Sequence, residues 1–338
     1  MGRPATAGYA RLSKPMPAIE VTDLSKTYKV PVRESGLRNS VRSLFKREFR
    51  EVLAVDQVSF EVPEGQLIGF LGPNGAGKST TLKMLSGLLY PTSGQARVLG
   101  HDPRLREEDY RRRIALVMGN RNSLQWDLPV MDSFELQRAI YQVPKVDFQR
   151  RRDEFIELLD VADLVTKPIR NLSLGERMKV EVIASLLHAP EVLFLDEPTL
   201  GLDVTMQKRL RGFIANYQKE SGASIILTSH YMADVEALCD RIIVIHEGAI
   251  LYDGDIGGLR SKFVSHRLIS FGGNEVSEEM VQLSDSVEGS PERTILKVPN
   301  DNVADVASLL LRRGVYDLSI ENVPLEDIID MAFTADES

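Results

Sequence analysis

The sequence is poor in the features that identify secreted and membrane-spanning proteins. It contains a single cysteine, Cys239, so an internal disulfide is excluded. No run approaches the roughly 18 to 20 consecutive apolar residues that a membrane-spanning helix needs, and any membrane role is therefore expected to be peripheral. The N-terminus lacks the apolar core and cleavage site of a signal peptide, so we expect the protein in the cytosol.

Basic residues are also in the minority, 41 against 49 acidic ones, and the two signs are unevenly distributed. Residues 1–52 hold eleven Lys and Arg against five Asp and Glu, whereas residues 271–338 hold four against fifteen. An acidic balance does not favour binding to a phosphate backbone, so we expect no nucleic-acid partner. The 338 residues, 43% of them hydrophobic, are enough for roughly two domains with buried cores.

Short apolar runs separated by helix-length segments predict an α/β fold with a mainly parallel sheet covered on both faces. Strands are predicted at 18–22, 58–62, 67–71, 192–195, 224–228 and 242–245. A helix from Lys78 to about Leu89 follows the third of these, and helical periodicity among many charges from about 126 to 167 predicts an inserted helical subdomain. Beyond Gly258, strands at 267–271, 294–298 and 317–320 with a helix at 303–313 predict a small α+β domain.

A glycine-rich loop between the strand at 67–71 and the following helix carries the first chemistry. Residues 72–79 read Gly-Pro-Asn-Gly-Ala-Gly-Lys-Ser, in which glycines let backbone N–H groups surround phosphate at a helix N-terminus. Lys78 would neutralise the β- and γ-phosphates, and Ser79 would ligate Mg²⁺. The residues assigned to the nucleotide here are Gly72, Pro73, Asn74, Gly75, Ala76, Gly77, Lys78, Ser79 and Thr80. This loop predicts a P-loop nucleoside triphosphatase, and it would serve a kinase, a GTPase or a motor equally well.

Two carboxylates, Asp196 and Glu197, end the apolar strand at 192–195, at the sheet edge where ligands bind in such folds. Asp196 suits Mg²⁺, and Glu197 suits a water molecule. About twenty residues earlier, Leu172-Ser-Leu-Gly-Glu176 resembles the LSGGQ signature of the ABC ATPase family, with differences at the third and fifth positions.

Further motifs in the same order and spacing carry this resemblance. Residues 201–203, Gly-Leu-Asp, are similar to the family's D-loop, and residues 228–230, Thr-Ser-His, to its H-loop. The resemblance implies that Ser173 and Gly175 bind the γ-phosphate of ATP held by an opposite subunit, with Glu176 and Asp203 as further residues of the nucleotide site. It also implies that His230 contacts the γ-phosphate and holds Glu197 and the water, and that Tyr28 stacks on adenine. One chain alone would then not complete a site.

Two positions depart from the family's pattern. Asn120 stands where the family has the Q-loop glutamine, so its shorter carboxamide reaches the metal or the attacking water only through another water, unless Gln125 substitutes for it. Glu176 replaces the signature glutamine and adds a negative charge near a phosphate-rich interface. The departure at Asn120 affects the expected coupling efficiency and not nucleotide binding, and the departure at Glu176 predicts a lowered turnover.

The predicted fold class is thus α/β, a P-loop NTPase (ABC ATPase) core with an antiparallel β subdomain and a helical subdomain, plus a small C-terminal α+β domain. The predicted division is an N-terminal tail at 1–17, an ATPase domain at 18–258 and an accessory domain at 259–338. Within the ATPase domain, residues 31–52 form a basic insertion and about 120–170 the helical subdomain. If helical, residues 38–50 would be a basic amphipathic segment, which would contact the membrane subunits or an anionic membrane surface, or be solvated.

The resemblance covers residues 18 to about 260 and is greatest to ATPases of ABC-2 type exporters. It implies an ATP-hydrolysing subunit that binds ATP and Mg²⁺, pairs with a second ATPase subunit and powers export through separate transmembrane permease subunits. Its expected place is peripheral, on the cytoplasmic face of the cell membrane. The alternatives are a soluble ABC-type ATPase acting on ribosomes or DNA, which the single motif set and the absence of a heptad run disfavour, and a non-hydrolysing regulatory subunit, which Glu197 and His230 disfavour.

Overall fold

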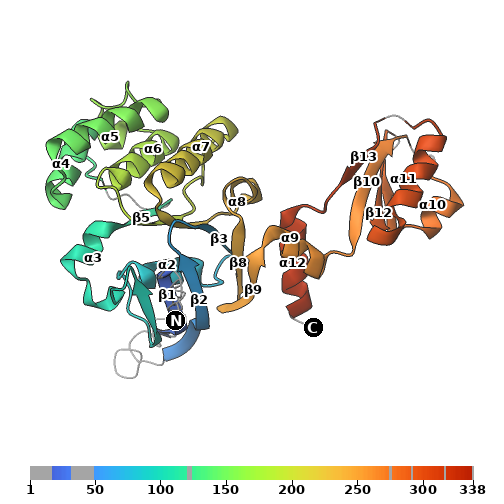
Figure 1. The fold of residues 1–338 in the computed structure, drawn as a ribbon, viewed down its shortest axis with the longest axis horizontal. Helices are drawn as coiled ribbons and strands as arrows, with labels where there is room; N and C mark the ends of the chain where they lie inside the picture. The colour runs from blue at the N-terminus through green and yellow to red at the C-terminus, as the bar shows by residue number, and fades with distance from the viewer. Residues whose placement is uncertain are drawn as a thin grey trace, which may run out of the picture.

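A six-stranded sheet runs through the body of the chain in the order β5-β6-β7-β3-β8-β9 (Figure 1). The computed structural model describes residues 17–31, 49–119, 124–273, 276–290, 292–315 and 317–336. Neighbouring strands are parallel except for β9, which runs antiparallel to β8, so the prediction of a mainly parallel sheet is confirmed. The strands are β3 (Leu67–Leu71), β5 (Ile114–Met118), β6 (Val192–Asp196), β7 (Ser224–Thr228), β8 (Arg241–His246) and β9 (Ala249–Asp255).

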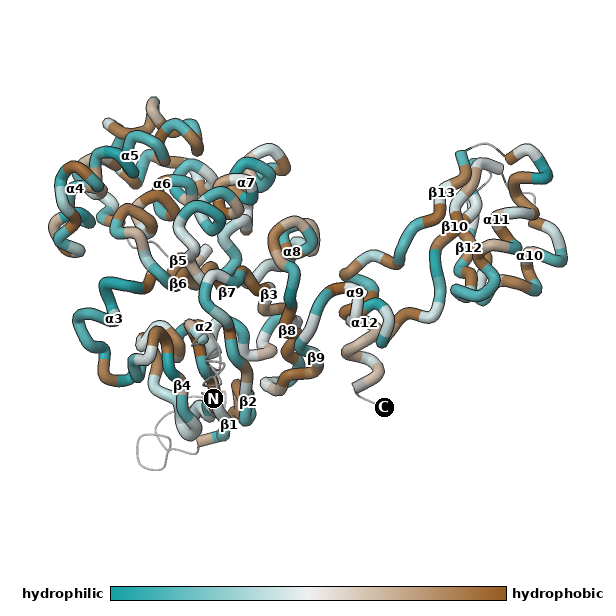
Figure 2. Tube along the Cα trace, viewed as in Figure 1, coloured by the Kyte–Doolittle hydropathy of each residue, from teal (hydrophilic) through white to brown (hydrophobic). Residues whose placement is uncertain are grey.

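Successive residues of the central strands point into two different hydrophobic cores. In β3, Ile68 and Phe70 join one core, whereas Leu67 and Leu71 join the other. Strands β6, β7 and β8 alternate in the same way. Because both faces of the sheet are covered, the middle positions of these strands are almost all apolar, as the hydrophobic colouring of β3 and β8 in Figure 2 shows.

Helices cover one face of this sheet and a second sheet covers the other. The helices of the first face are α4 (Val130–Tyr141), α5 (Lys145–Leu158), α6 (Leu174–Leu186), α7 (Val204–Ser221) and α8 (Met232–Leu238). The opposite face holds α2 (Lys78–Leu85), α3 (Glu108–Arg113) and a three-stranded antiparallel sheet of order β2-β1-β4. Its strands are β1 (Pro17–Pro31), β2 (Phe49–Pro63) and β4 (Ser93–Val98). In the described part of the chain, no helix has the length and apolar content to cross a bilayer.

The β1–β2 hairpin is longer than the sequence predicted. Its pairing continues to Pro31 opposite Phe49, so the ends of the predicted insertion at 31–52 are strand. The rest of that segment, including most of the basic stretch at 38–50, lies outside the described residues. The outer halves of both strands are exposed and are held by backbone hydrogen bonds. Their sequence therefore has no alternation of apolar and polar residues from which a strand could be predicted.

The C-terminal part forms a separate lobe, drawn at the right of Figure 1. Its antiparallel sheet has the order β11-β12-β10-β13 and a hydrophobic core of its own. The elements are β10 (His266–Gly272), α10 (Glu278–Gln282), β11 (Ser286–Gly289), β12 (Arg293–Pro299), α11 (Val303–Arg312) and β13 (Ser319–Glu321).

The last helix, α12 (Leu325–Asp336), leaves this lobe and packs on α9 (Ile256–Phe263). Ile328 and Ile329 of α12 join the core beneath the parallel sheet, and Phe333 stacks on His246 at the end of β8, with ring centroids 4.8 Å apart. The sheet of the predicted 259–338 segment is therefore a lobe, whereas α12 near its end packs with the body, together with α9, which begins before residue 259.

Candidate active site

The phosphate loop joins β3 to α2 and depends on glycine at its two ends. A Cβ at Gly72 would lie 2.2 Å from the Ile245 carbonyl oxygen, and one at Gly77 would lie 2.4 Å from the Ala54 carbonyl oxygen. Gly77 also has φ +107°, which side chains strongly disfavour. The two ends of the loop thus pack closely against the backbone of β8 and β2, and this packing fixes the curvature of the loop.

Lys78 is buried inside this loop. Its Nζ donates to the carbonyl oxygens of Gly72 at 2.5 Å and Pro73 at 3.0 Å. Burial lowers the pKa of Lys78, and the negative charges of Glu197 and Asp196 oppose that shift. The ammonium is therefore held within the loop, near two carboxylates and at the N-terminus of α2, where phosphates bind in such loops.

Ser79 and Asp196, the two predicted metal ligands, are in contact. The Ser79 hydroxyl donates to Asp196 Oδ1 at 3.0 Å, and Thr228 Oγ1 donates to the same oxygen at 2.9 Å. A hydroxyl and a carboxylate beside a phosphate loop are hard oxygen donors of the kind that Mg²⁺ prefers when it bridges phosphates. This donor set fits a magnesium ion held by Ser79 and Asp196.

Glu197 and His230 face each other across the ends of β6 and β7. Their side chains are 2.8 Å apart between Glu197 Oε1 and His230 Nε2, and both are partly exposed. The backbone of Glu197 is left-handed, with φ 55°, and its N–H donates to both the carbonyl and the hydroxyl oxygen of Thr228 at 3.1 Å. These bonds fix the backbone from which the Glu197 carboxylate reaches His230, so the pair has the geometry expected of a proton acceptor with an orienting partner.

Asn120 lies outside the described residues, but Gly119 immediately before it is described. Its N–H donates to the carbonyl oxygen of Asp196 at 2.8 Å, at the end of β5. The segment that leads to Asn120 therefore starts beside the two carboxylates. Gln125, the predicted substitute, is exposed.

The signature residues form the N-terminus of α6. Ser173 is the N-cap: its Oγ accepts from the N–H of Glu176 at 3.3 Å, and Glu176 Oε2 accepts from the N–H of Ser173 at 2.8 Å. These bonds lower the pKa of Glu176. The carboxylate is therefore tied to the helix N-terminus in a capping box, and the negative charge expected at the interface is partly offset by the helix end that holds it.

In the described structure no hydrogen bond or ion pair joins Ser173, Gly175 or Glu176 to the phosphate loop. The signature turn instead packs on the segment after Glu197, since a Cβ at Gly201 would lie 2.5 Å from Leu174 Cδ2. Asp203 caps α7 through its Oδ1, which accepts from the N–H of Met206 at 2.9 Å. The structure thus brings the predicted residues together in two groups, one around the phosphate loop and one around the signature.

Tyr28 lies on β1, opposite Val52 of β2, and is half-buried. The Lys26 ammonium lies 5.4 Å from the centroid of the Tyr28 ring. A partly exposed phenol ring is a side chain that can stack on a base.

Sequence reasoning missed the role of Thr228 and the contacts of Gly119. The family resemblance identifies Thr228 only as the start of the H-loop. In the structure its hydroxyl donates to Asp196 and accepts from the backbone N–H of Glu197. Its place at the end of an apolar strand, beside two carboxylates on the neighbouring strand, was the available signal.

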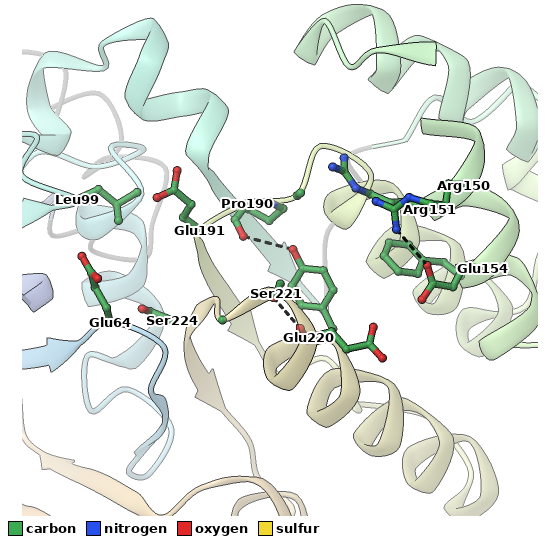
Figure 3. Close-up of a pocket in the computed structure, with 14 residues that line it drawn as sticks. Glu64, Leu99, Arg150, Arg151, Glu154, Pro190, Glu191, Glu220, Ser221 and Ser224 are labelled. Atoms are coloured by element: carbon green, nitrogen blue, oxygen red, sulfur yellow. Dashed lines mark hydrogen bonds and ion pairs between the residues drawn. The ribbon is translucent and has the colours of Figure 1, made fainter. Parts of the chain in front are cut away.

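A cavity of about 450 Å³ opens at the opposite edge of the sheet (Figure 3). Glu191, just before β6, and Ser224, the first residue of β7, line it together with Arg150 of α5 and Tyr217 of α7. The Tyr217 hydroxyl donates to the Pro190 carbonyl at 3.3 Å. Because this cavity lies at the amino ends of strands whose carboxyl ends carry Asp196 and Thr228, it is separate from the candidate site.

Comparison with known proteins agrees with this geometry. Residues 55–200 match the family described as ABC transporter. The chain is 32% identical over 215 residues to the ATP-binding protein NatA of Bacillus subtilis, covering 64% of this chain and 87% of NatA. It is 33% identical over 223 residues to the daunorubicin resistance ATP-binding protein DrrA3 of Streptomyces coeruleorubidus, covering 66% and 70%. A solved ATP-binding subunit of an ABC transporter, 27% identical, superposes with a TM-score of 0.61 over 73% of this chain and 93% of that one. The chain therefore belongs to the ABC transporter family, as one of its ATP-binding, ATP-hydrolysing members.

Proposed function

We propose that this chain hydrolyses ATP at sites shared between two ATPase subunits and so powers export through separate permease subunits. The observation that carries the proposal is the division of the site residues into two groups. Lys78, Ser79, Asp196, Glu197 and His230 are assembled within one chain, whereas the N-cap of α6 at Ser173 makes none of its described hydrogen bonds with them. A helix N-terminus binds anions through its free N–H groups. The N-terminus of α6 would bind the γ-phosphate of the ATP that the facing subunit holds.

Exposed apolar side chains near the signature support such a partner. Leu174 is 41% exposed, Leu200 is 39% exposed, and Val204 at the start of α7 is 77% exposed. The Leu174 side chain touches the turn at Gly201, so these residues belong to one region of the surface. Burying them against a second ATPase subunit would contribute roughly 25 cal/mol for each Å² of apolar area removed from water.

Within each site the residues have distinct roles. Lys78 neutralises the β- and γ-phosphates, Tyr28 stacks on adenine, and Glu197 takes a proton from the attacking water while His230 orients its carboxylate. Ser79 and Asp196 hold Mg²⁺, which supplies charge neutralisation on the phosphates when bound. The proposed set also includes Asn120, which would contact the water or the metal. Its remaining members lie at the interface between the subunits: Gly175, Glu176 and Asp203.

The transport part of the proposal comes from the relatives. One of them is named for resistance to daunorubicin, which favours export as the direction of transport. The subunit would then be peripheral, on the cytoplasmic face of the membrane, bound to permease subunits. The basic segment at 38–50 stays a candidate for contact with those subunits or with an anionic membrane surface, and a soluble ATPase acting on ribosomes or DNA is the alternative.

Mixing two inactive variants tests the shared site. Lys78→Ala removes the phosphate-loop charge, while Ser173→Asp keeps a good N-cap for α6 but places a carboxylate against the facing γ-phosphate. Each variant alone should be inactive. Mixed, they form dimers in which one site has both Lys78 and Ser173 intact, so roughly a quarter of the wild-type activity per site should return. No gain on mixing, or full activity from a strict monomer, would overturn the proposal.

A further inference from the structure

Asp234 on α8 is a completely buried carboxylate that the catalytic scheme above does not use. Its relative exposure is 0%, and three side chains hold it. Oδ2 accepts from Thr199 Oγ1 at 2.6 Å and from Ser229 Oγ at 2.9 Å, while Oδ1 accepts from Arg211 of α7 at 2.5 Å. A buried charge persists only when it is paired and hydrogen-bonded, so this group is a fixed junction of three segments.

Two of those segments carry the candidate catalytic pair. Thr199 follows Glu197 by two residues, in a turn in which the N–H of Leu200 donates to the Glu197 carbonyl at 3.2 Å. Ser229 immediately precedes His230, and its hydroxyl oxygen also accepts from the N–H of Tyr231 at 3.0 Å. One oxygen atom of Asp234 therefore connects the segment after Glu197 with the segment that carries His230.

We propose that Asp234 is a positioning residue that sets the 2.8 Å approach of His230 to Glu197. The inference rests on the proposed roles of that pair. Thr199 and Ser229 are 2% and 3% exposed, so water cannot easily replace either bond. Loss of the shared oxygen would let the two segments move apart, and a misplacement of about 1 Å at a reacting group can reduce a rate by roughly 10²-fold.

A carboxylate is the group this junction requires. It accepts from all three donors at once, whereas an amide in the same place presents an NH₂ group to one of them and carries no charge for Arg211. Asp234→Asn is therefore close to isosteric but leaves at least one donor facing another donor. The hydroxyls of Thr199 and Ser229 and the guanidinium of Arg211 therefore all need an acceptor at this position.

The first test compares Asp234→Asn with Glu236→Gln on the same helix. Glu236 is exposed and makes an ion pair with Arg260 at 2.7 Å, and in the described residues no hydrogen bond joins its side chain to the catalytic segments. For Asp234→Asn we expect kcat for ATP hydrolysis to fall about 10- to 100-fold. ATP affinity should stay within about twofold, because in the described residues no hydrogen bond or ion pair joins this network to the phosphate loop. Glu236→Gln should leave both unchanged.

A second test asks whether Asp234 acts through Glu197. If it does, adding Asp234→Asn to Glu197→Gln should cause no further loss, because residues that act as a unit are not additive. Independent losses that multiply would assign Asp234 a separate role and overturn the inference. Wild-type hydrolysis by Glu197→Gln would instead refute the proposed function, so the two failures are distinguishable.

Thr199→Val and Ser229→Ala keep the inference testable if Asp234→Asn does not fold. Each removes one bond to Asp234 and leaves its pairing with Arg211 intact. We expect each to lower kcat with ATP affinity retained. Wild-type kcat in both variants, measured on folded protein, would overturn the inference.

Discussion

Replacing Gly119 with alanine tests the geometry of the site with a single methyl group. The added Cβ would lie 2.4 Å from the Glu197 carbonyl oxygen, where a carbon–oxygen contact needs about 3.3 Å. The obstructing atom is backbone at the end of β6, which pairs with β5 through Met118 opposite Asp196, so no side-chain rotation relieves the overlap. Glu197 must therefore move by roughly 1 Å, which should lower kcat about 10²-fold and cost about 1–3 kcal/mol of stability through overpacking.

Gly212→Ala is the matched control, because a Cβ at this position of α7 meets nothing within 4 Å. Alanine in a helix interior is favoured over glycine by up to about 1 kcal/mol, so this variant should be fully active and equally or more stable. The assay is phosphate release under saturating ATP, with thermal unfolding and nucleotide affinity measured on the same samples. A Gly119→Ala protein with wild-type kcat would refute the assigned approach of β5 to Glu197.

Three further predictions concern the phosphate loop, the signature and the C-terminal helix. Lys78→Ala should weaken binding of a fluorescent ATP analogue at least about tenfold, since a hydrogen bond to a charged group is worth about 1.5–3 kcal/mol. Because the pKa of Glu176 is lowered in the folded chain, its stabilising charge is present near neutral pH and is lost as the pH falls through that lowered value. The advantage of wild type over Glu176→Gln in urea unfolding, about 0.5 kcal/mol at about pH 7, should therefore shrink toward about pH 4. Phe333→Ala removes a stack on His246 worth about 0.5–1.5 kcal/mol; thermal unfolding should show the lower stability, and an unchanged melting temperature would contradict it.

The buried strands could be predicted from sequence because short apolar runs between turns are typical of strands buried on both faces. Every residue of β3, β6 and β7 is buried, and a short apolar run bounded by turns has no other stable place in a fold of this kind. By contrast, β4 is largely exposed and reads Ser-Gly-Gln-Ala-Arg-Val, so its strand character comes from pairing with β1. A strand held mainly by backbone hydrogen bonds need not alternate apolar and polar residues, so its sequence gives no strand signal. The outer part of the β1–β2 hairpin was not predicted for the same reason.

The candidate site divides along a similar line. Residues whose chemistry is local to a motif, such as Lys78 in its loop and Glu197 after its strand, could be assigned from sequence. Contacts that join motifs could not: Asp234 is 35 residues from Thr199, and nothing in the spacing indicates that one carboxylate binds both Thr199 and Ser229. The hydrogen bond from the Ser173 N–H to the Glu176 carboxylate was also not predicted, although Ser173 and Glu176 are spaced as a capping box.

The order of strands in the parallel sheet explains why one part of the proposed site is held together within one chain and the other part is not. β6, β7 and β3 are neighbours, so their carboxyl ends bring Asp196 and Glu197, the Thr228–His230 segment and the phosphate loop to one edge. Hydrogen bonds from Thr228 and the junction at Asp234 then fix that edge without any ligand. The signature turn stands on a helix outside the sheet, and its capping box completes its own side-chain bonds while leaving N–H groups of the first turn for an anion. In the proposed shared site, such a chain would hold Glu197 and His230 in place before ATP binds, and the approach of a second signature turn would be the step that the nucleotide promotes.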